Sequence, residues 1–368
     1  MTDPTRADDA GQATEHVGDP TAPPVETVTP TPALPTNARA AAWRQRVQQL
    51  LAFGGLIAIF IVFTIASPQV FPTPSNISNI LFSTVVVGLL SLGATLVIIT
   101  SGIDLSVGTG MALCAVMAGT FVTTWGLPAP IGIIGAIAFG GLIGMVNGVN
   151  VTLLKLPPFI ATLAMMLVCQ GLALVVSDKK PIYFDPASGY VNISTGSLID
   201  DNFLPGVPLP RNFPNAIIVF AIAAVIAWVL LSRTVLGRYN FAIGSNEEAT
   251  KLSGINVTKW LIIIYAVAGL FTGLAGVMIS ARLGSAQPAT GAGYELQAIA
   301  AVVIGGTSLS GGKGSILGTV IGALIISVLN NGLQIISVPQ EWQNVILGVV
   351  ILLAVYADQL RARREAVH

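Results

Sequence analysis

The sequence predicts an all-α, polytopic integral membrane protein with about ten transmembrane helices and both termini in the cytoplasm. Three observations carry this prediction. Charged residues make up 9% of the 368-residue chain and apolar residues 53%, whereas a soluble domain averages about 25% charged residues. The mean hydropathy of +0.80 leaves too little polar material for a water-exposed surface. Apolar runs of the length that crosses a bilayer recur along the chain, without the alternation of barrel strands.

The two ends of the chain are polar. Residues 1–42 are rich in proline, alanine, threonine and acids, and such a composition predicts disorder. The first apolar run begins near Leu50, behind Arg39, Arg44 and Arg46, which favours a retained helix over a cleaved signal peptide. We therefore predict three parts: a disordered cytoplasmic tail (1–42), a transmembrane domain (43–360) and a basic cytoplasmic C-terminal tail (361–368).

The apolar runs define the predicted helices in order. Because backbone groups in lipid must pair within their own segment, each run is predicted to be a helix. The ten candidate spans are 48–66, 79–99, 108–124, 129–150, 158–176, 215–232, 259–280, 294–308, 315–333 and 343–357.

Positive residues orient these spans. With the N-terminus in the cytoplasm, 13 of the 17 lysines and arginines fall on the inside and four on the outside, as the positive-inside rule requires. The longest external connection, about 177–213, carries Pro, Gly, Asp and Tyr and is predicted to be an ordered loop. The longest internal connection is 233–258.

One stretch of sequence occurs twice. Residues 102–113 and 306–317 are identical at six of twelve positions, and each copy lies between two apolar runs. Paired glycine-broken segments in a transporter indicate its pathway or gates; the alternative is a chance likeness between glycine-rich turns. Both copies are predicted near the cytoplasmic side, which suits a gate or an interface. The candidate residues are Gly102, Asp104, Ser106 and Gly108 in the first copy, and Gly306, Ser310 and Gly312 in the second.

Two acids lie beside apolar spans, where a charge is costly. Asp104 is predicted either to cap the next helix or to serve the pathway or gate. Glu295, at the predicted outer start of a span, is predicted either to interact with the helix dipole or to belong to the pathway.

The chain lacks the residues of an enzyme. Its two histidines, His16 and His368, are near the termini, and Cys114 and Cys169 lie inside apolar runs. These positions exclude a catalytic histidine or a histidine-bound metal in the membrane body. Gly311-Gly312-Lys313 is not followed by a Ser or Thr, so it is not a nucleotide phosphate loop. We predict no catalytic residue, no metal and no bound cofactor, and the zero net charge argues against a nucleic-acid partner.

The internal connection contains a short predicted helix. It begins at Ser245 or Asn246, has Glu247 and Glu248 in its first turn and ends at Gly254. An exposed helix of this kind suits docking into a groove of a partner protein, although the same pattern fits a solvated loop.

Residues 244–257 resemble the cytoplasmic coupling loop of permeases of ATP-binding-cassette (ABC) importers. Segments 100–108, 281–288, 293–303 and 305–314 resemble the ribose/xylose-type branch, within the branched-chain amino acid/ribose permease superfamily, and the resemblance covers about 45–358. It implies that an ATPase subunit contacts Gly244, Asn246, Glu247, Glu248, Ala249 and Gly254.

The resemblance also implies the rest of the transporter. Cytoplasmic ATPase subunits would bind ATP and Mg²⁺ and drive alternating access. An extracytoplasmic sugar-binding protein would deliver a monosaccharide. A second permease copy would form a homodimer with this chain, surrounded by the lipid of the bacterial inner membrane. Ribose or a similar pentose is the expected solute. Two other functions compete with this one: an ion-coupled secondary sugar transporter, and a membrane receptor or scaffold without transport.

Overall fold

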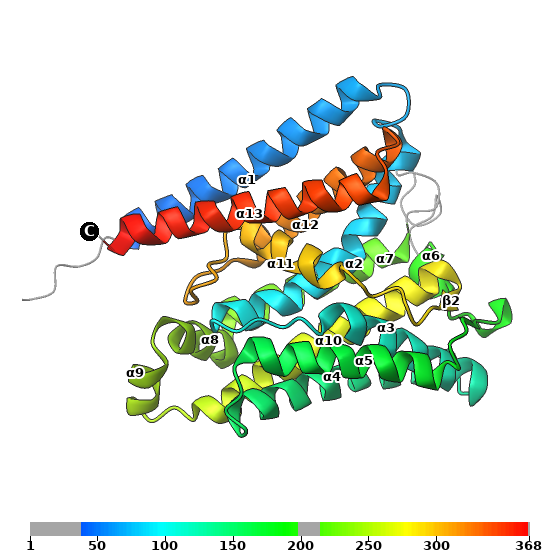
Figure 1. The fold of residues 1–368 in the computed structure, drawn as a ribbon, viewed down its shortest axis with the longest axis horizontal. Coiled ribbons are helices and arrows are strands. Elements are labelled where there is room, and N and C mark those ends of the chain that lie inside the picture. Colours follow the sequence, from blue (N-terminus) through cyan, green and yellow to red (C-terminus); the bar gives the residue numbers. More distant parts are fainter. Residues whose placement is uncertain (1–37, 198–213, 367–368) are drawn as a thin grey trace, which may run out of the picture. The chain divides into compact units, whose positions relative to one another are not determined.

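A computed structural model describes residues 38–197 and 214–366, with side chains described for 52–197 and 214–360. The described part is almost entirely helical (Figure 1). The first half contains α1 (Ala38–Ala66), α2 (Pro74–Ile99), α3 (Val107–Gly119) with a π-helical turn η1 (Thr120–Thr124), α4 (Ala129–Thr152), α5 (Pro158–Val176), β1 (Ile182–Tyr183), the 3₁₀ turn η2 (Pro186–Ser188) and α6 (Asn192–Thr195). The second half contains α7 (Asn215–Arg233), α8 (Val235–Ser245), α9 (Glu247–Leu252), α10 (Val257–Leu283), β2 (Ser285–Ala286), α11 (Tyr294–Ile304), α12 (Ile316–Ile335) and α13 (Gln340–Ala366).

Each predicted apolar run coincides with a helix, and eight of the described helices are long and apolar enough to cross a membrane. The predicted span 294–308 is wrong as a crossing. Helix α11 has 11 residues, about 16 Å at 1.5 Å per residue, which is roughly half of the hydrocarbon core. It ends where Gly306 takes a left-handed backbone conformation (φ 87°).

The predicted boundaries at the two ends shift. Helix α1 begins at Ala38, so residues 38–42 are helical and do not belong to a disordered tail; residues 1–37 lie outside the described residues. Helix α13 continues to Ala366 and includes most of the basic C-terminal segment.

Glycines allow the closest helix pair, α4 with α10, to pack backbone against backbone (Figure 1). Gly140 and Gly144 on α4 face Gly269 and Gly273 on α10, and a Cβ added at Gly140 would lie 2.7 Å from Gly273 Cα. Small residues spaced by four are typical of membrane helices that associate closely. This pair forms one side of the main core around α2, which is buried on nearly all sides.

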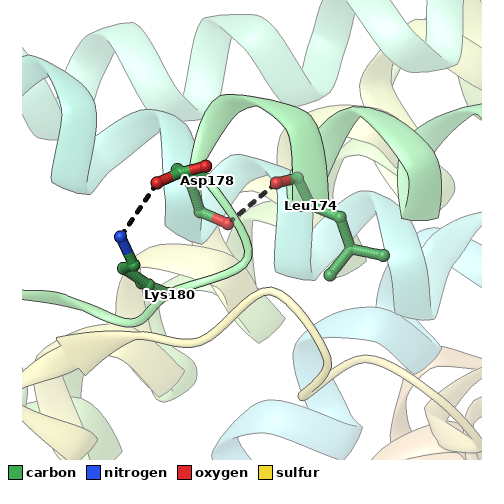
Figure 2. Close-up of polar contacts among 4 residues, drawn as sticks. Leu174, Asp178 and Lys180 are labelled. Carbon is green, nitrogen blue, oxygen red and sulfur yellow. Dashed lines mark hydrogen bonds and ion pairs between the residues drawn. The ribbon is translucent and has the colours of Figure 1, made fainter.

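The loop after α5 is ordered as predicted over its described part, 177–197; residues 198–213 lie outside the described residues. Strand β1 pairs antiparallel with β2, with Ile182 opposite Ala286, and this pair ties the loop to the end of α10. The Tyr190 hydroxyl lies 2.8 Å from Ser280 Oγ on α10. At the start of the loop, Lys180 Nζ lies 3.0 Å from Asp178 Oδ2 (Figure 2), an exposed ion pair of small energetic value.

Candidate functional site

The two copies of the repeated sequence lie against each other. Gly312 N donates a hydrogen bond to the Ile99 carbonyl oxygen (2.9 Å), and Ser101 Oγ donates one to the Ser310 carbonyl oxygen (3.0 Å). The turn after α2 therefore contacts the turn that joins α11 to α12. We call this contact between residues 99–102 and 310–312 the loop junction.

The two copies nevertheless differ in conformation. Helices α2 and α11 end in the same way, with a left-handed residue followed by a backbone hydrogen bond five residues back, but the left-handed residue is Ser101 in one copy and Gly306 in the other. The aligned pair Gly102 and Gly306 is thus offset by one residue. Helix α3 begins at Val107, whereas α12 begins only at Ile316, so the second copy remains a loop where the first is already helical.

Asp104 belongs to a buried polar cluster at the start of α3. Its Oδ1 accepts hydrogen bonds from Ser106 N (2.8 Å) and Ser106 Oγ (2.6 Å), and Asn147 Nδ2 on α4 donates to Ser106 Oγ (2.8 Å). Thr162 on α5 donates to the Ile103 carbonyl oxygen (3.1 Å). Burial raises the pKa of the Asp104 carboxyl, and the hydrogen bonds from Ser106 and Asn147 oppose that rise.

This arrangement differs from the predicted helix cap. The residue at the cap position of α3 is Ser106. Asp104 accepts hydrogen bonds from Ser106 and therefore does not cap the helix directly. Asn147 and Thr162 were not among the predicted site residues, although each is a polar residue inside an apolar run, and that pattern is the signal that identifies them.

Gly108 and Glu295 are in contact. A Cβ added at Gly108 would collide with Glu295 Oε2 and with the Gly291 carbonyl oxygen, and Glu295 Oε1 accepts a hydrogen bond from Gly293 N (3.1 Å). The prediction that the first repeat lies near the cytoplasmic side and Glu295 at the outer surface is therefore wrong for one of the two. Helix α11 has only 11 residues and does not reach from one membrane surface to the other, so its first turn is not fixed at the outer surface.

The predicted short helix in the internal connection is present as α9. Asn246 caps it, with Oδ1 accepting from Ala249 N (2.9 Å), Glu247 and Glu248 occupy its first turn, and Gly254 follows it with a φ of 81°. Most of its surface is free, and the Leu252 side chain is 89% exposed. The helix thus presents an acidic first turn and an apolar side chain to a potential partner.

Gly244 differs from the other residues of this segment because it faces the protein interior. It lies near the end of α8. This helix was not predicted, although Leu236, Asn240 and Ile243 form a buried face at helical spacing. A Cβ at Gly244 would collide with the Ile99 carbonyl oxygen and lie 2.7 Å from Gly312 N. Gly244 therefore contacts both sides of the loop junction, two residues before the cap of α9.

The described residues contain no group of three His, Cys, Asp or Glu side chains that could hold a metal ion. The candidate site thus consists of backbone contacts and one buried carboxyl cluster. Such an arrangement can transmit or block movement.

Comparison with known proteins places the chain in a family. Residues 76–355 match the family model described as branched-chain amino acid transport system / permease component. The chain is 45% identical over 319 residues to the ribose import permease protein RbsC of Escherichia coli K12, covering 86% of this chain and 94% of the relative. It is 44% identical over 317 residues to RbsC of Bacillus subtilis 168 (86% and 94%).

A more distant relative is the xylose transport system permease protein XylH of Haemophilus influenzae Rd, 36% identical over 358 residues, with 82% of this chain and 94% of the relative covered. No solved structure matches the chain. The family model covers most of the chain, and the chain spans nearly the whole length of these relatives. The chain belongs to the family of permease components of branched-chain amino acid transport systems.

Proposed function

We propose that the chain is the permease subunit of an ABC importer that moves a monosaccharide inward, with ribose or a similar pentose as the expected solute. The names of its relatives support this proposal, since three sugars, ribose, xylose and fructose, are named among proteins that are 36–45% identical to it. ATP hydrolysis belongs to separate cytoplasmic ATPase subunits, which bind ATP and Mg²⁺. The complex lies in the bacterial inner membrane, with a second permease copy forming a homodimer.

The contact of Gly244 with the loop junction is the observation that carries the proposed mechanism. Helix α9 is exposed and capped, as a docking element needs to be, and the chain leads from it directly to Gly244. Closure of the ATPases on α9 would displace Gly244, and Gly244 has no free space against the Ile99 and Gly312 backbones. The movement would therefore reach both repeat loops at once.

The extracytoplasmic sugar-binding protein would contact the loop after α5. Its described part is held by the β1–β2 pair and by Tyr190, and Tyr183 within it is 70% exposed. A rigid loop with an exposed aromatic side chain suits a protein contact.

Reconstitution tests the function. The chain is placed in proteoliposomes with its ATPase and its sugar-binding protein, and uptake of labelled ribose is measured with and without ATP inside the vesicles. We expect uptake only when ATP and both partners are present. Uptake driven by a proton or sodium gradient, without the ATPase, would instead identify a secondary transporter.

A further inference from the structure

A polar cavity lies among the membrane helices, away from the loop junction. It has a volume of about 280 Å³ and is lined by α2, α11, α12 and the start of α13, with Arg282 at the end of α10. This volume is at the lower limit of small-molecule sites, roughly 300 Å³ and above, and so suits a small solute. Carboxamide side chains dominate its lining: Gln297, Asn330, Asn331, Gln334, Gln340, Gln343 and Asn344.

The spacing of these residues shows that α12 turns one polar face to the cavity. On α12, Ser327, Asn330, Asn331 and Gln334 stand at positions i, i+3, i+4 and i+7, which share one face of a helix. The rest of α12 is apolar enough to span a membrane. Polar side chains in such a helix are costly and require a function or a partner.

Helix-to-helix hydrogen bonding accounts for only some of these groups. Asn330 Nδ2 donates to Gln297 Oε1 (3.2 Å), and Asn331 Nδ2 donates to Asn76 Oδ1 (2.9 Å). Ser327 Oγ and Asn331 Oδ1, however, have no hydrogen-bond partner, and both atoms are fully covered by neighbouring atoms next to the cavity. Polar residues that only joined helices would be expected to pair fully with one another and to leave no cavity. Here two polar groups next to the cavity remain without a partner.

The chemistry of the lining selects the class of ligand. Carboxamides and hydroxyls both donate and accept hydrogen bonds, as the hydroxyls of a sugar do. Among the described lining residues the only charged side chain is Arg282, and no carboxylate is present to pair with an ammonium group. An amino acid would leave its ammonium unpaired here, whereas a neutral polyol would not. Tyr294 adds an aromatic ring against which the apolar face of a sugar can pack.

We propose that this cavity binds the transported monosaccharide within the membrane. The inference rests on the proposed function and deepens it, because it assigns the residues of this chain that contact the sugar. Gln334 and Asn344 extend the site toward the connection between α12 and α13. Ser327 Oγ and Asn331 Oδ1 have no partner in the protein and are covered in this structure, so they reach the sugar when their side chains turn toward the cavity.

A pair of serine variants separates sugar contact from structure. Ser327→Ala removes a hydroxyl without a protein partner, so we expect unchanged thermal stability and an uptake rate lower by roughly 3- to 10-fold, the factor of one hydrogen bond. Ser91→Ala is the matched control, because Ser91 Oγ on α2 donates to the Val87 (2.7 Å) and Ala298 (3.3 Å) carbonyl oxygens and does not line the cavity. It is expected to lower stability while each folded molecule transports normally. Normal uptake by Ser327→Ala would overturn the proposal.

Protection from labelling tests binding directly. In the full transporter, Gln334→Cys is treated with a charged methanethiosulfonate reagent with and without D-ribose; the native Cys114 and Cys169 are buried. At about ten times the dissociation constant, ribose should lower the labelling rate roughly tenfold, and L-leucine should not. Gln287→Cys, another exposed glutamine but outside the cavity lining, is the control and should label equally fast in both conditions.

The outcomes distinguish the site from the function. If the transporter imports a sugar but ribose, xylose and fructose all fail to protect Gln334→Cys, the cavity is not the sugar site and the proposed function stands. If leucine protects and no sugar is imported, both the ligand class and the proposed function are overturned.

Discussion

Replacement of Gly244 by alanine tests whether the loop junction transmits movement. The added Cβ would collide with the Ile99 carbonyl oxygen and lie 2.7 Å from Gly312 N, whereas real Cβ contacts stay beyond 3.0 Å. Backbone atoms must therefore shift. Overpacking costs about 1–3 kcal/mol, and loss of the hydrogen bond from Gly312 to Ile99 adds about 0.5–1.5 kcal/mol. If the substitution destabilises one access state by about 2 kcal/mol more than the other, the transport rate falls roughly 30-fold.

The assay is ATP-dependent sugar uptake in proteoliposomes, together with co-purification of the ATPase. We expect Gly244→Ala to lose most uptake while it still binds the ATPase, because the exposed surface of α9 is unchanged. Gly171→Ala is the control, since Gly171 lies in α5 with no atom within 4 Å of its added Cβ. Uptake by Gly244→Ala within about twofold of the unmodified chain, a difference worth only about 0.4 kcal/mol, would refute the role of the junction.

Three further variants test the remaining assignments. Charge reversal of Glu247 and Glu248 to lysine should reduce ATPase co-purification without unfolding the membrane helices, and undiminished co-purification would contradict the coupling role. Gly102→Val and Gly306→Val should each impair uptake. The first variant clashes with a buried tyrosine hydroxyl, and in the second the φ of 87° costs a β-branched residue about 1–2 kcal/mol or more. Normal uptake in both variants would mean that the repeated sequence is a coincidence. Removal of residues 1–37 should leave uptake intact, because the family match begins at residue 76, and loss of uptake at normal expression would assign the tail a function.

The helices and the local caps could be predicted from sequence because their causes are local. Apolar runs placed the long described helices, though not α6 or α8, and the Asn246 cap and Gly254 stop of α9 follow from side-chain chemistry within one turn. The wrong crossing at 294–308 has a different cause. Its composition is as apolar as that of the other runs, and only the paired glycines at 305 and 306 signal that the helix ends early.

The contacts of the candidate site could not be predicted because they join distant parts of the chain. Nothing in the sequence near Gly244 indicates that it faces Ile99, and the gapless match of the two repeats concealed the one-residue offset between Ser101 and Gly306. The polar face of α12 was present in the sequence as a helical pattern, but a cavity depends on what its neighbours leave empty.

The cavity and the loop junction are joined by two helices. Helix α2 lines the cavity at Ser83 and meets the junction at Ile99, 16 residues and about 24 Å away. Helix α11 lines the cavity at Gln297 and leads into the turn that carries Gly312. A shift of Gly244 would therefore act on the end of α2 and on the turn that follows α11, the two helices whose other parts line the proposed sugar site. Because α11 spans only about half of the membrane, its ends lie where a half-helix of a transporter typically meets the pathway. In the proposed mechanism, packed backbone alone would couple the work of an ATPase to the opening of the proposed binding site.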